Sequence, residues 1–144
     1  MATIKLEVVS PDRVVYANDI AMLIVRSTAG ELGILPRHAP LVTGLIPHAM
    51  RVKLPGESEE RLLAVAGGFM EVTPEKITVL ASAAEEPEAI DVNRAQKAYQ
   101  RAKERIAAFH QSVPESTDID MGRAELALQR AKARLMATKT HFDD

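Results

Sequence analysis

Six arginines at helical spacing are the side chains of this sequence best suited to bind an anion. The phrase IDVNRAQKAYQRAKERI, residues 90–106, recurs as IDMGRAELALQRAKARL at residues 119–135, with ten of seventeen positions identical. At about 100° per residue, the arginines of each copy fall within roughly 40° of one another on a helix. They are Arg94, Arg101 and Arg105 in the first copy and Arg123, Arg130 and Arg134 in the second. Guanidinium groups gathered in this way suit a polyphosphate.

Two helices must position these arginines, and both copies of the phrase predict one. Apolar positions step by three and four residues, which gives each helix a single seam for pairing with another helix. The seams are Val92, Ala95, Tyr99, Ala102, Ile106 and Phe109, then Met121, Ala124, Leu128, Ala131, Leu135 and Thr138. Asp91 is placed to cap the first helix, and residues 112–118 break it before Asp118 or Asp120 begins the second. The short connection favours an antiparallel hairpin.

An antiparallel hairpin brings the two sets of arginines to one corner. The start of the first helix then lies beside the end of the second, so Asp91, Arg94 and Arg101 approach Arg130 and Arg134. Free N–H groups at the helix N-terminus favour an anion at the same corner. The alternative is that the arginines form solvated faces with intrahelical ion pairs, such as Arg101 with Glu104.

Alanine occupies four of the twelve seam positions. Burying an alanine contributes much less than the roughly 1.5–3 kcal/mol of a leucine or isoleucine. We therefore expect a hairpin that is helical but weakly held and able to exchange one partner for another. Tighter packing of an alanine-rich coil is the alternative.

The first part of the chain has the pattern of an antiparallel sheet. Ile4, Leu6 and Val8 alternate onto one face, and the apolar run of residues 20–25 predicts a strand buried on both sides. Two hairpins are expected, one turning in the loop 55–60 and one at residues 73–76. Several short strands within about 80 residues indicate a β-sandwich or flattened barrel. Glycines near residues 30–33 and 67–68 are interpreted as turns and bulges, since neither segment matches a phosphate-binding loop.

Composition excludes several classes of function. The hydrophobic fraction of 47%, the charged fraction of 26% and the net charge of −2 are those of an ordinary soluble domain. Without cysteine there is no disulfide, thiolate nucleophile or cysteine zinc site, and no apolar run is long enough for a membrane span. The histidines, His38, His48, His110 and His141, lack metal-ligand spacing. No arrangement of side chains suggests catalysis, so we expect a cytoplasmic chain that is not an enzyme on its own.

Two segments resemble a known family. TAGELGILPRHAPL, residues 28–41, and AVAGGFMEVTPEKITVLASAAE, residues 64–85, look like the epsilon subunit of bacterial F-type ATP synthase. The resemblance implies a β-sandwich of about ten strands over residues 1–84, followed by a linker and a regulatory helical hairpin over residues 85–144. It implies a non-catalytic rotor subunit that contacts the gamma subunit and the c-subunit ring, at the cytoplasmic face of the cell membrane. Such subunits help couple proton translocation to ATP synthesis.

The hairpin of this family acts as a brake on ATP hydrolysis. Contracted against the sandwich it permits rotation, and extended toward the alpha and beta subunits of the catalytic head it inhibits. ATP-binding members carry the motif I/L-D-x-x-R-A, which matches Ile90, Asp91, Arg94 and Ala95 here. Their other contacts correspond to Glu85, Arg101, Arg130 and Arg134. The resemblance thus implies ATP as a regulatory ligand with no required cofactor, and the sequence leaves open whether Mg²⁺ accompanies it.

One departure concerns the segment HQSVPESTDID, residues 110–120, which contains Pro114 and is longer than a tight connection. Its length affects whether the arginines converge. The second copy of the motif, IDMGRA from Ile119, is interpreted as a helix start. Two other functions stay open: the same stalk subunit whose arginines dock on the catalytic head without nucleotide, or an adaptor whose basic helices bind nucleic acid. The near-neutral charge and the absence of aromatic residues from the arginine stripes argue against nucleic acid.

Overall fold

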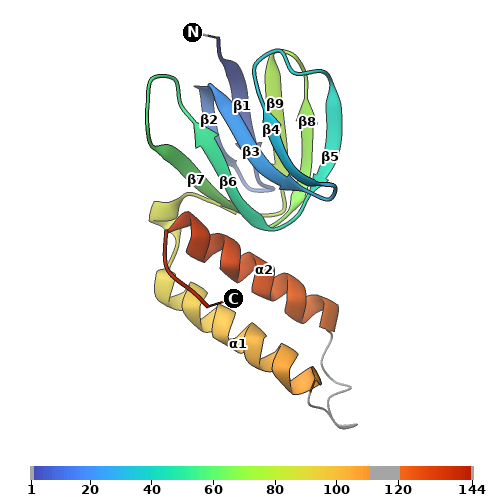
Figure 1. Cartoon of the computed structure of the whole chain (residues 1–144), viewed down its shortest axis with the longest axis vertical. Coiled ribbons are helices and arrows are strands. Elements are labelled where there is room, and N and C mark those ends of the chain that lie inside the picture. Colours follow the sequence, from blue (N-terminus) through green and yellow to red (C-terminus); the bar gives the residue numbers. More distant parts are fainter. Residues whose placement is uncertain (1, 111–120, 144) are drawn as a thin grey trace.

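The computed structural model describes residues 2–110 and 121–143, which form a β-sandwich with a helical hairpin beneath it (Figure 1). This confirms the predicted fold class. The strands are β1 (Ile4–Val9), β2 (Val14–Ile20), β3 (Met22–Ser27), β4 (Gly30–Ile34), β5 (Leu41–Leu45), β6 (His48–Lys53), β7 (Glu60–Val65), β8 (Gly68–Val72), β9 (Lys76–Ala81) and β10 (Ala84–Glu85). A short 3₁₀ helix, η1 (Pro87–Ala89), leads into the helices α1 (Val92–His110) and α2 (Met121–Ala137).

The ten strands share one continuous sheet in the order β10-β7-β6-β3-β5-β8-β9-β1-β2, with β4 paired to β3. Both predicted hairpins are confirmed, β6 with β7 and β8 with β9. The second turns where the N–H of Thr73 donates to the carbonyl of Lys76 at 2.8 Å. Strand β1 pairs in parallel with β9, which ties the start of the chain to the later part of the sheet.

In the sandwich core, every second residue along a strand points inward. Ile4, Leu6 and Val8 are all buried, as the period of two predicts. Gly68 is needed where β8 begins, because its φ of +142° lies outside the range of other residues and an added Cβ would lie 2.2 Å from the carbonyl oxygen of Leu80.

The prediction of one strand buried on both sides at residues 20–25 is wrong. The chain bends at Ala21, so Ile20 ends β2 and Met22 begins β3. In β3, Leu23 and Val25 are buried while Ile24 is half-buried. An antiparallel sandwich gives each strand one inner face, so a continuous apolar run here still alternates between the core and the outer surface.

Helix α1 begins where the sequence predicted. The carboxylate of Asp91 accepts a hydrogen bond from the backbone N–H of Arg94 at 3.0 Å, which is the bond of an N-cap. The predicted starts of α2 at Asp118 or Asp120, and the connection containing Pro114, lie outside the described residues.

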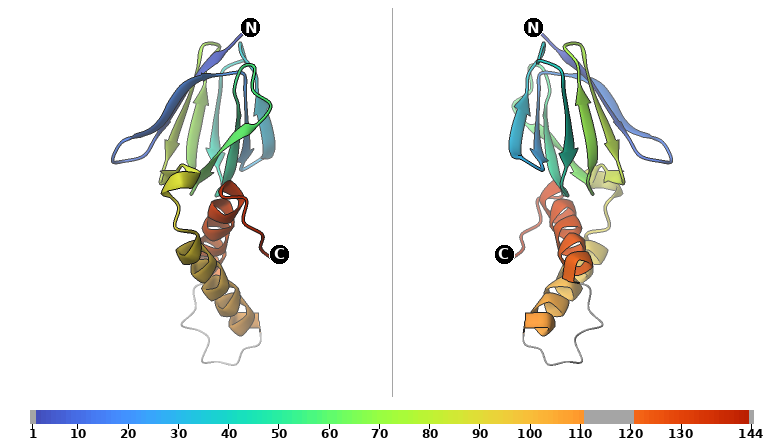
Figure 2. Two further views of the ribbon diagram at one scale, coloured as in Figure 1. Left: turned by 90° about the vertical axis from the view of Figure 1, so that its left-hand side faces the viewer. Right: turned by 90° about the vertical axis from the view of Figure 1, so that its right-hand side faces the viewer.

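Helix α2 packs on the outer face of β6 and β7, and α1 lies on the far side of α2 (Figures 1 and 2). Small side chains dominate this contact. Ala49 and Ala64 are paired across the two strands, and Ala133 and Ala137 are buried on the helix. The inner seam of α1 consists of buried Ala95, Tyr99 and Ala102. The alanines of the predicted α1 seam are buried as expected, whereas Phe109, also predicted in the seam, is 38% exposed. A weakly held hairpin stays a prediction.

After α2 the chain reverses and lies against the hairpin. Lys139 has a φ of 55°, and the N–H of Thr140 donates to the carbonyl of Leu135 at 2.8 Å, which ends the helix as in a Schellman motif. The ring of Phe142 then meets the ring of Tyr99 edge to face, with centroids 5.4 Å apart. The tail thus connects the end of α2 to α1.

Candidate functional site

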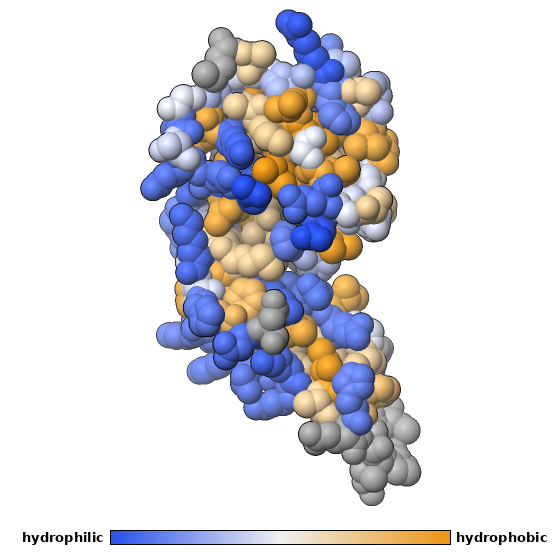
Figure 3. All heavy atoms as spheres, viewed as in Figure 1, coloured by the Kyte–Doolittle hydropathy of each residue, from blue (hydrophilic) through white to orange (hydrophobic). Residues whose placement is uncertain are grey.

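An open groove of about 610 Å³ lies between the end of the sheet, the first turns of α1 and the end of α2. It is lined by Glu85, Ala89, Asp91, Asn93, Arg94, Ala95, Lys97, Ala98, Arg101 and Arg134. Four of these residues are cationic and two are acidic, so the groove has an excess of positive charge. Hydrophilic residues also cover much of the visible face of the hairpin in Figure 3. Guanidinium and ammonium groups gathered in one groove are the side chains that suit an anion.

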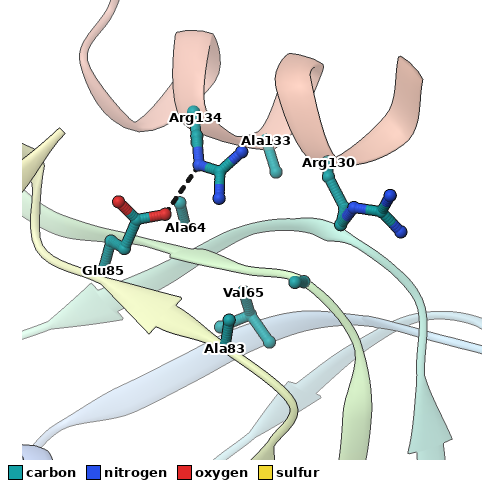
Figure 4. A pocket seen from close by; sticks show the side chains of 8 residues that line it. Ala64, Val65, Ala83, Glu85, Arg130, Ala133 and Arg134 are labelled. Carbon is teal, nitrogen blue, oxygen red and sulfur yellow. Dashed lines mark hydrogen bonds and ion pairs between the residues drawn. The ribbon is translucent and has the colours of Figure 1, made fainter. Parts of the chain in front are cut away.

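Six of the eight residues predicted for the ATP site line this one groove: Glu85, Asp91, Arg94, Ala95, Arg101 and Arg134. Ile90 is only 8% exposed and packs in the apolar cluster that joins the hairpin to the sandwich. Arg130 lines a neighbouring small pocket against β7 (Figure 4). There its guanidinium points away from Glu85. The structure therefore gathers six of the predicted residues around one groove, and the side chain of Arg130 lies outside it.

Glu85 and Arg134 form the shortest side-chain hydrogen bond among the described residues that line the groove. Nε of Arg134 donates to Oε1 of Glu85 at 2.6 Å, and both side chains are about one-third exposed, 34% and 29% respectively (Figure 4). Glu85 was expected in the linker, yet it is the last residue of β10 and pairs with Ala64 of β7. The ion pair therefore joins α2 to the sandwich.

The cations of α1 that line the groove are exposed. Among the described residues, Arg94, Lys97 and Arg101 have no side-chain ion pair or hydrogen bond. The alternative in which Arg101 pairs with Glu104 is not realised, because Glu104 instead accepts a hydrogen bond from Gln100 at 3.3 Å. These cations are therefore not neutralised by the helix that carries them.

Two polar groove residues, Asn93 and Lys97, are absent from the sequence prediction. Lys97 follows Arg94 by three residues and precedes Arg101 by four, so it shares their face of the helix. That spacing could have identified it. Among cationic side chains the prediction considered arginine alone, and it therefore missed Lys97.

Arg61 of β7 holds the linker in place beside the groove. Its guanidinium donates to both carboxylate oxygens of Glu88, each at 2.7 Å, and to Glu86 at 2.9 Å. The hydrogen bonds to Arg61 lower the pKa of Glu88 from its ordinary value of 4.5 to about 2. The same bonds raise the pKa of Arg61. This clasp fixes η1, and with it the approach to the start of α1.

Fold and groove together define a class: a β-sandwich protein with a helical hairpin docked on β6 and β7 and a groove rich in cationic side chains at the hairpin base. The family description "ATP synthase, Delta/Epsilon chain, beta-sandwich domain" matches residues 3–87. The description "ATP synthase, Delta/Epsilon chain, long alpha-helix domain" matches residues 88–139. The chain belongs to this delta/epsilon family of ATP synthase subunits.

Individual relatives agree with this assignment. The ATP synthase epsilon chain of Alkalihalophilus pseudofirmus is 52% identical over 77% of this chain and 82% of its own length. The ATP synthase epsilon chain of Bacillus subtilis is 50% identical over 74% of this chain and 79% of its own. This chain is therefore an epsilon-type subunit, which is a stalk component and not the catalytic subunit.

Solved structures show the same fold inside assembled enzymes. A chain of the Euglena gracilis mitochondrial ATP synthase, solved as OSCP/F1/c-ring, superposes with a TM-score of 0.74 at 25% identity, covering 95% of this chain and 81% of that one. A chain from the central stalk/c-ring of the Tetrahymena thermophila mitochondrial ATP synthase has a TM-score of 0.54 at 10% identity, covering 95% and 97%, and shows the fold alone. In the described part of this chain, no helix is long and apolar enough to cross a membrane. Membership in the family nevertheless associates it with a membrane-bound complex.

Proposed function

We propose that this chain is a rotor subunit of the central stalk whose hairpin inhibits ATP hydrolysis when extended and binds ATP when contracted. The observation that carries the ATP site is the composition of the groove. Glu85 comes from the sandwich, Arg94 and Arg101 from α1, and Arg134 from α2. All three parts meet only when the hairpin is docked, so a ligand in the groove stabilises the contracted arrangement over the extended one.

The side chains around the groove suit a nucleotide. The start of α1 supplies backbone N–H groups next to Arg94 and Arg101, which favours phosphates at that end. Ala95 and Ala98 line the groove with small side chains and leave room for a flat base or a sugar. Arg130 joins the site when its side chain rotates out of the neighbouring pocket, since it lies one helical turn from Arg134.

Titration of ATP into the full-length protein, followed by NMR, tests the site. We expect saturable shifts of amides near residues 85–101 and 130–134. Arg101→Ala should weaken binding about tenfold, the effect of one charge-assisted contact. Arg105→Ala is the matched control, because Arg105 is exposed on the same helix and does not line the groove. No saturable shift at millimolar ATP contradicts the proposed site.

The brake requires the hairpin to leave the sandwich, and the contact between them suits this. Among the described residues, six of the nine buried in this cluster are alanines, and the other three are Ile90, Tyr99 and Leu135. Because alanine buries little apolar area, undocking α2 from β6 and β7 costs less than separating an interface built of leucine throughout. The contracted and extended arrangements then differ by a modest free energy. The binding free energy of a ligand or a partner subunit is large enough to reverse such a difference.

A reversible crosslink tests the brake. The chain has no cysteine, so Ala64→Cys with Ala133→Cys introduces one pair, placed where β7 and α2 line the same small pocket. The assembled enzyme carrying the crosslinked subunit should hydrolyse ATP without inhibition, and reduction should restore inhibition. Equal hydrolysis rates before and after reduction contradict the brake.

A second candidate function is docking of the α1 cations on the catalytic head without nucleotide. Arg94, Lys97 and Arg101 are exposed and have no side-chain partner within the described ranges 2–110 and 121–143, which favours it. In that case Arg101→Ala relieves inhibition of hydrolysis in the assembled enzyme, while the isolated protein shows no ATP-dependent shifts. The two candidates therefore give opposite results in the NMR titration.

The sandwich carries a separate apolar surface, which we propose binds the gamma subunit. The c-subunit ring would lie at the same end of the stalk. Val42 of β5, Phe69 of β8 and Leu80 of β9 are 71%, 63% and 57% exposed. Phe69 and Leu80 are directly paired, and they border an open apolar hollow of about 460 Å³. Exposed apolar surface of this kind marks a protein-binding site.

Charge substitutions test this surface. Phe69→Asp with Leu80→Asp should abolish association with gamma, and with it attachment to the cytoplasmic face of the membrane-bound complex. Leu126→Asp is the control, because Leu126 is 50% exposed on α2, away from this surface. Normal assembly of the double variant contradicts the assignment.

A further inference from the structure

We propose that Lys97 is a further phosphate-binding residue of the groove, placed between Arg94 and Arg101. The inference rests on the proposed ATP site and adds a residue that the motif does not contain. With a rise of 1.5 Å per residue, the three cations lie about 4.5 Å and about 6 Å apart along the axis of α1, within roughly 60° of arc. This is a continuous row of positive charge along one wall of the groove.

The charges of the groove support a binding role for Lys97. Of the two acidic residues, Glu85 is already paired with Arg134, and Asp91 is engaged as the helix cap. The lining residues together leave two positive charges in excess, and removal of Lys97 halves that excess. A polyphosphate is the ligand class that uses several adjacent cations.

A structural role does not account for Lys97. The residues one turn away on α1 are Asn93 and Arg94 before it and Gln100 and Arg101 after it, so no acidic partner is within reach along the helix. Two arginines at this spacing repel the ammonium group and destabilise the helix slightly. Lys103 is different, because its Nζ lies 5.3 Å from the centre of the Tyr99 ring and packs there. Lys97 has no such contact among the residues that the structure describes.

The test uses the full-length chain and calorimetric titration with ATP. Lys97→Ala should raise Kd about three- to tenfold, the effect of one partly exposed charge-assisted contact, and should lower the dependence of Kd on salt. Lys97→Arg should keep Kd within about twofold, because the positive charge remains. Arg105→Ala removes one positive charge from α1 outside the groove and should also leave Kd within about twofold.

The possible outcomes separate this inference from the proposed function. If Lys97→Ala binds ATP as tightly as the unaltered chain while Arg101→Ala binds weakly, the ATP site stands and the role of Lys97 is overturned. If the unaltered chain does not bind ATP, both are overturned. Alanine at this exposed helical position favours the helix, so a folding defect is not expected, and circular dichroism verifies that.

Discussion

Glu85 and Arg134, which lie 49 residues apart in the sequence, are joined by a hydrogen bond of 2.6 Å between a carboxylate oxygen and Nε. One residue ends the sheet and the other belongs to the last turns of α2. The pair is therefore a direct polar link between the sandwich and the docked hairpin. It also forms one wall of the groove, so the groove and the docking of α2 depend on the same contact.

A double-mutant cycle measures this link. Glu85→Gln and Arg134→Gln should each lower the free energy of unfolding, with a coupling energy of less than about 1 kcal/mol because both side chains are partly exposed. Urea unfolding of the four variants provides the values. Glu31→Gln is the control, since its more exposed contact with Arg26 at 3.7 Å should contribute less. Purely additive effects at Glu85 and Arg134 contradict a stabilising link.

The clasp at Arg61 should be sensitive to acid. Glu88 has a pKa of about 2 in the folded chain against an ordinary value of 4.5, so its stabilising effect is complete above about pH 4.5 and is lost as the pH falls toward 2. Arg61→Gln should return the pKa of Glu88 toward 4.5. A carboxyl NMR titration measures it, and Arg51→Gln, which breaks the separate ion pair with Glu60, is the control. A pKa that stays near 2 in Arg61→Gln rules out the clasp as its cause.

Enlarging a side chain between α2 and the sheet should undock the hairpin. Ala133 is 1% exposed and faces β7, so Ala133→Leu overfills the contact at a cost of about 1–3 kcal/mol to the contracted arrangement. Hydrogen exchange of the α2 amides should become faster. Ala107→Leu, on the exposed face of α1, should leave exchange unchanged. Slow exchange in both variants would show that the contact tolerates the extra volume.

The tail after α2 should hold α1 in place. Phe142→Ala removes the edge-to-face contact with Tyr99 and should destabilise the hairpin by about 1 kcal/mol. Hydrogen exchange in the first turns of α1 reports this change. Phe109→Ala tests an equal truncation at the other end of α1, where the ring is 38% exposed, and should have a smaller effect. Equal effects of the two truncations count against a specific role of the tail.

Tyr99 provides a further test of the same contact. Its hydroxyl is buried and has no hydrogen-bond partner among the described residues. Burial of an unpaired hydroxyl costs free energy, so Tyr99→Phe should raise the free energy of unfolding by about 1 kcal/mol while keeping the ring contact with Phe142. Tyr16→Phe is the control, because the hydroxyl of Tyr16 accepts a hydrogen bond from Asn18 in an exposed position. A loss of stability in Tyr99→Phe contradicts this expectation.

Local pattern was sufficient for much of the fold. The cap at Asp91, the buried alternation of Ile4, Leu6 and Val8, and the turn after β8 were all predictable, because each depends on residues within one turn or one strand. The run at residues 20–25 was predicted wrongly. Its composition could not show that the chain bends at Ala21 and enters a strand with only one inner face.

The residues of the candidate groove likewise fall into those that the sequence pattern placed correctly and one that it did not. Helical spacing placed Arg94 and Arg101 on one face of α1, and antiparallel pairing brought Arg134 near them. The same spacing also predicted Arg130 at this corner, but its side chain lies in the pocket against β7. The direction of the Arg130 side chain depends on how α2 packs on the sheet. That packing is a contact between distant parts of the chain.

Local sequence patterns were enough to predict both helices, most strands and the helix faces that carry alanine and arginine. This follows because backbone hydrogen bonding and side-chain periodicity act over three or four residues. The folded chain alone shows that Glu85 belongs to the sheet and pairs with Arg134, and that the ring of Phe142 contacts the ring of Tyr99. Each contact joins residues that are distant in the sequence, 49 positions apart for Glu85 and Arg134, and a one-dimensional pattern does not contain such contacts.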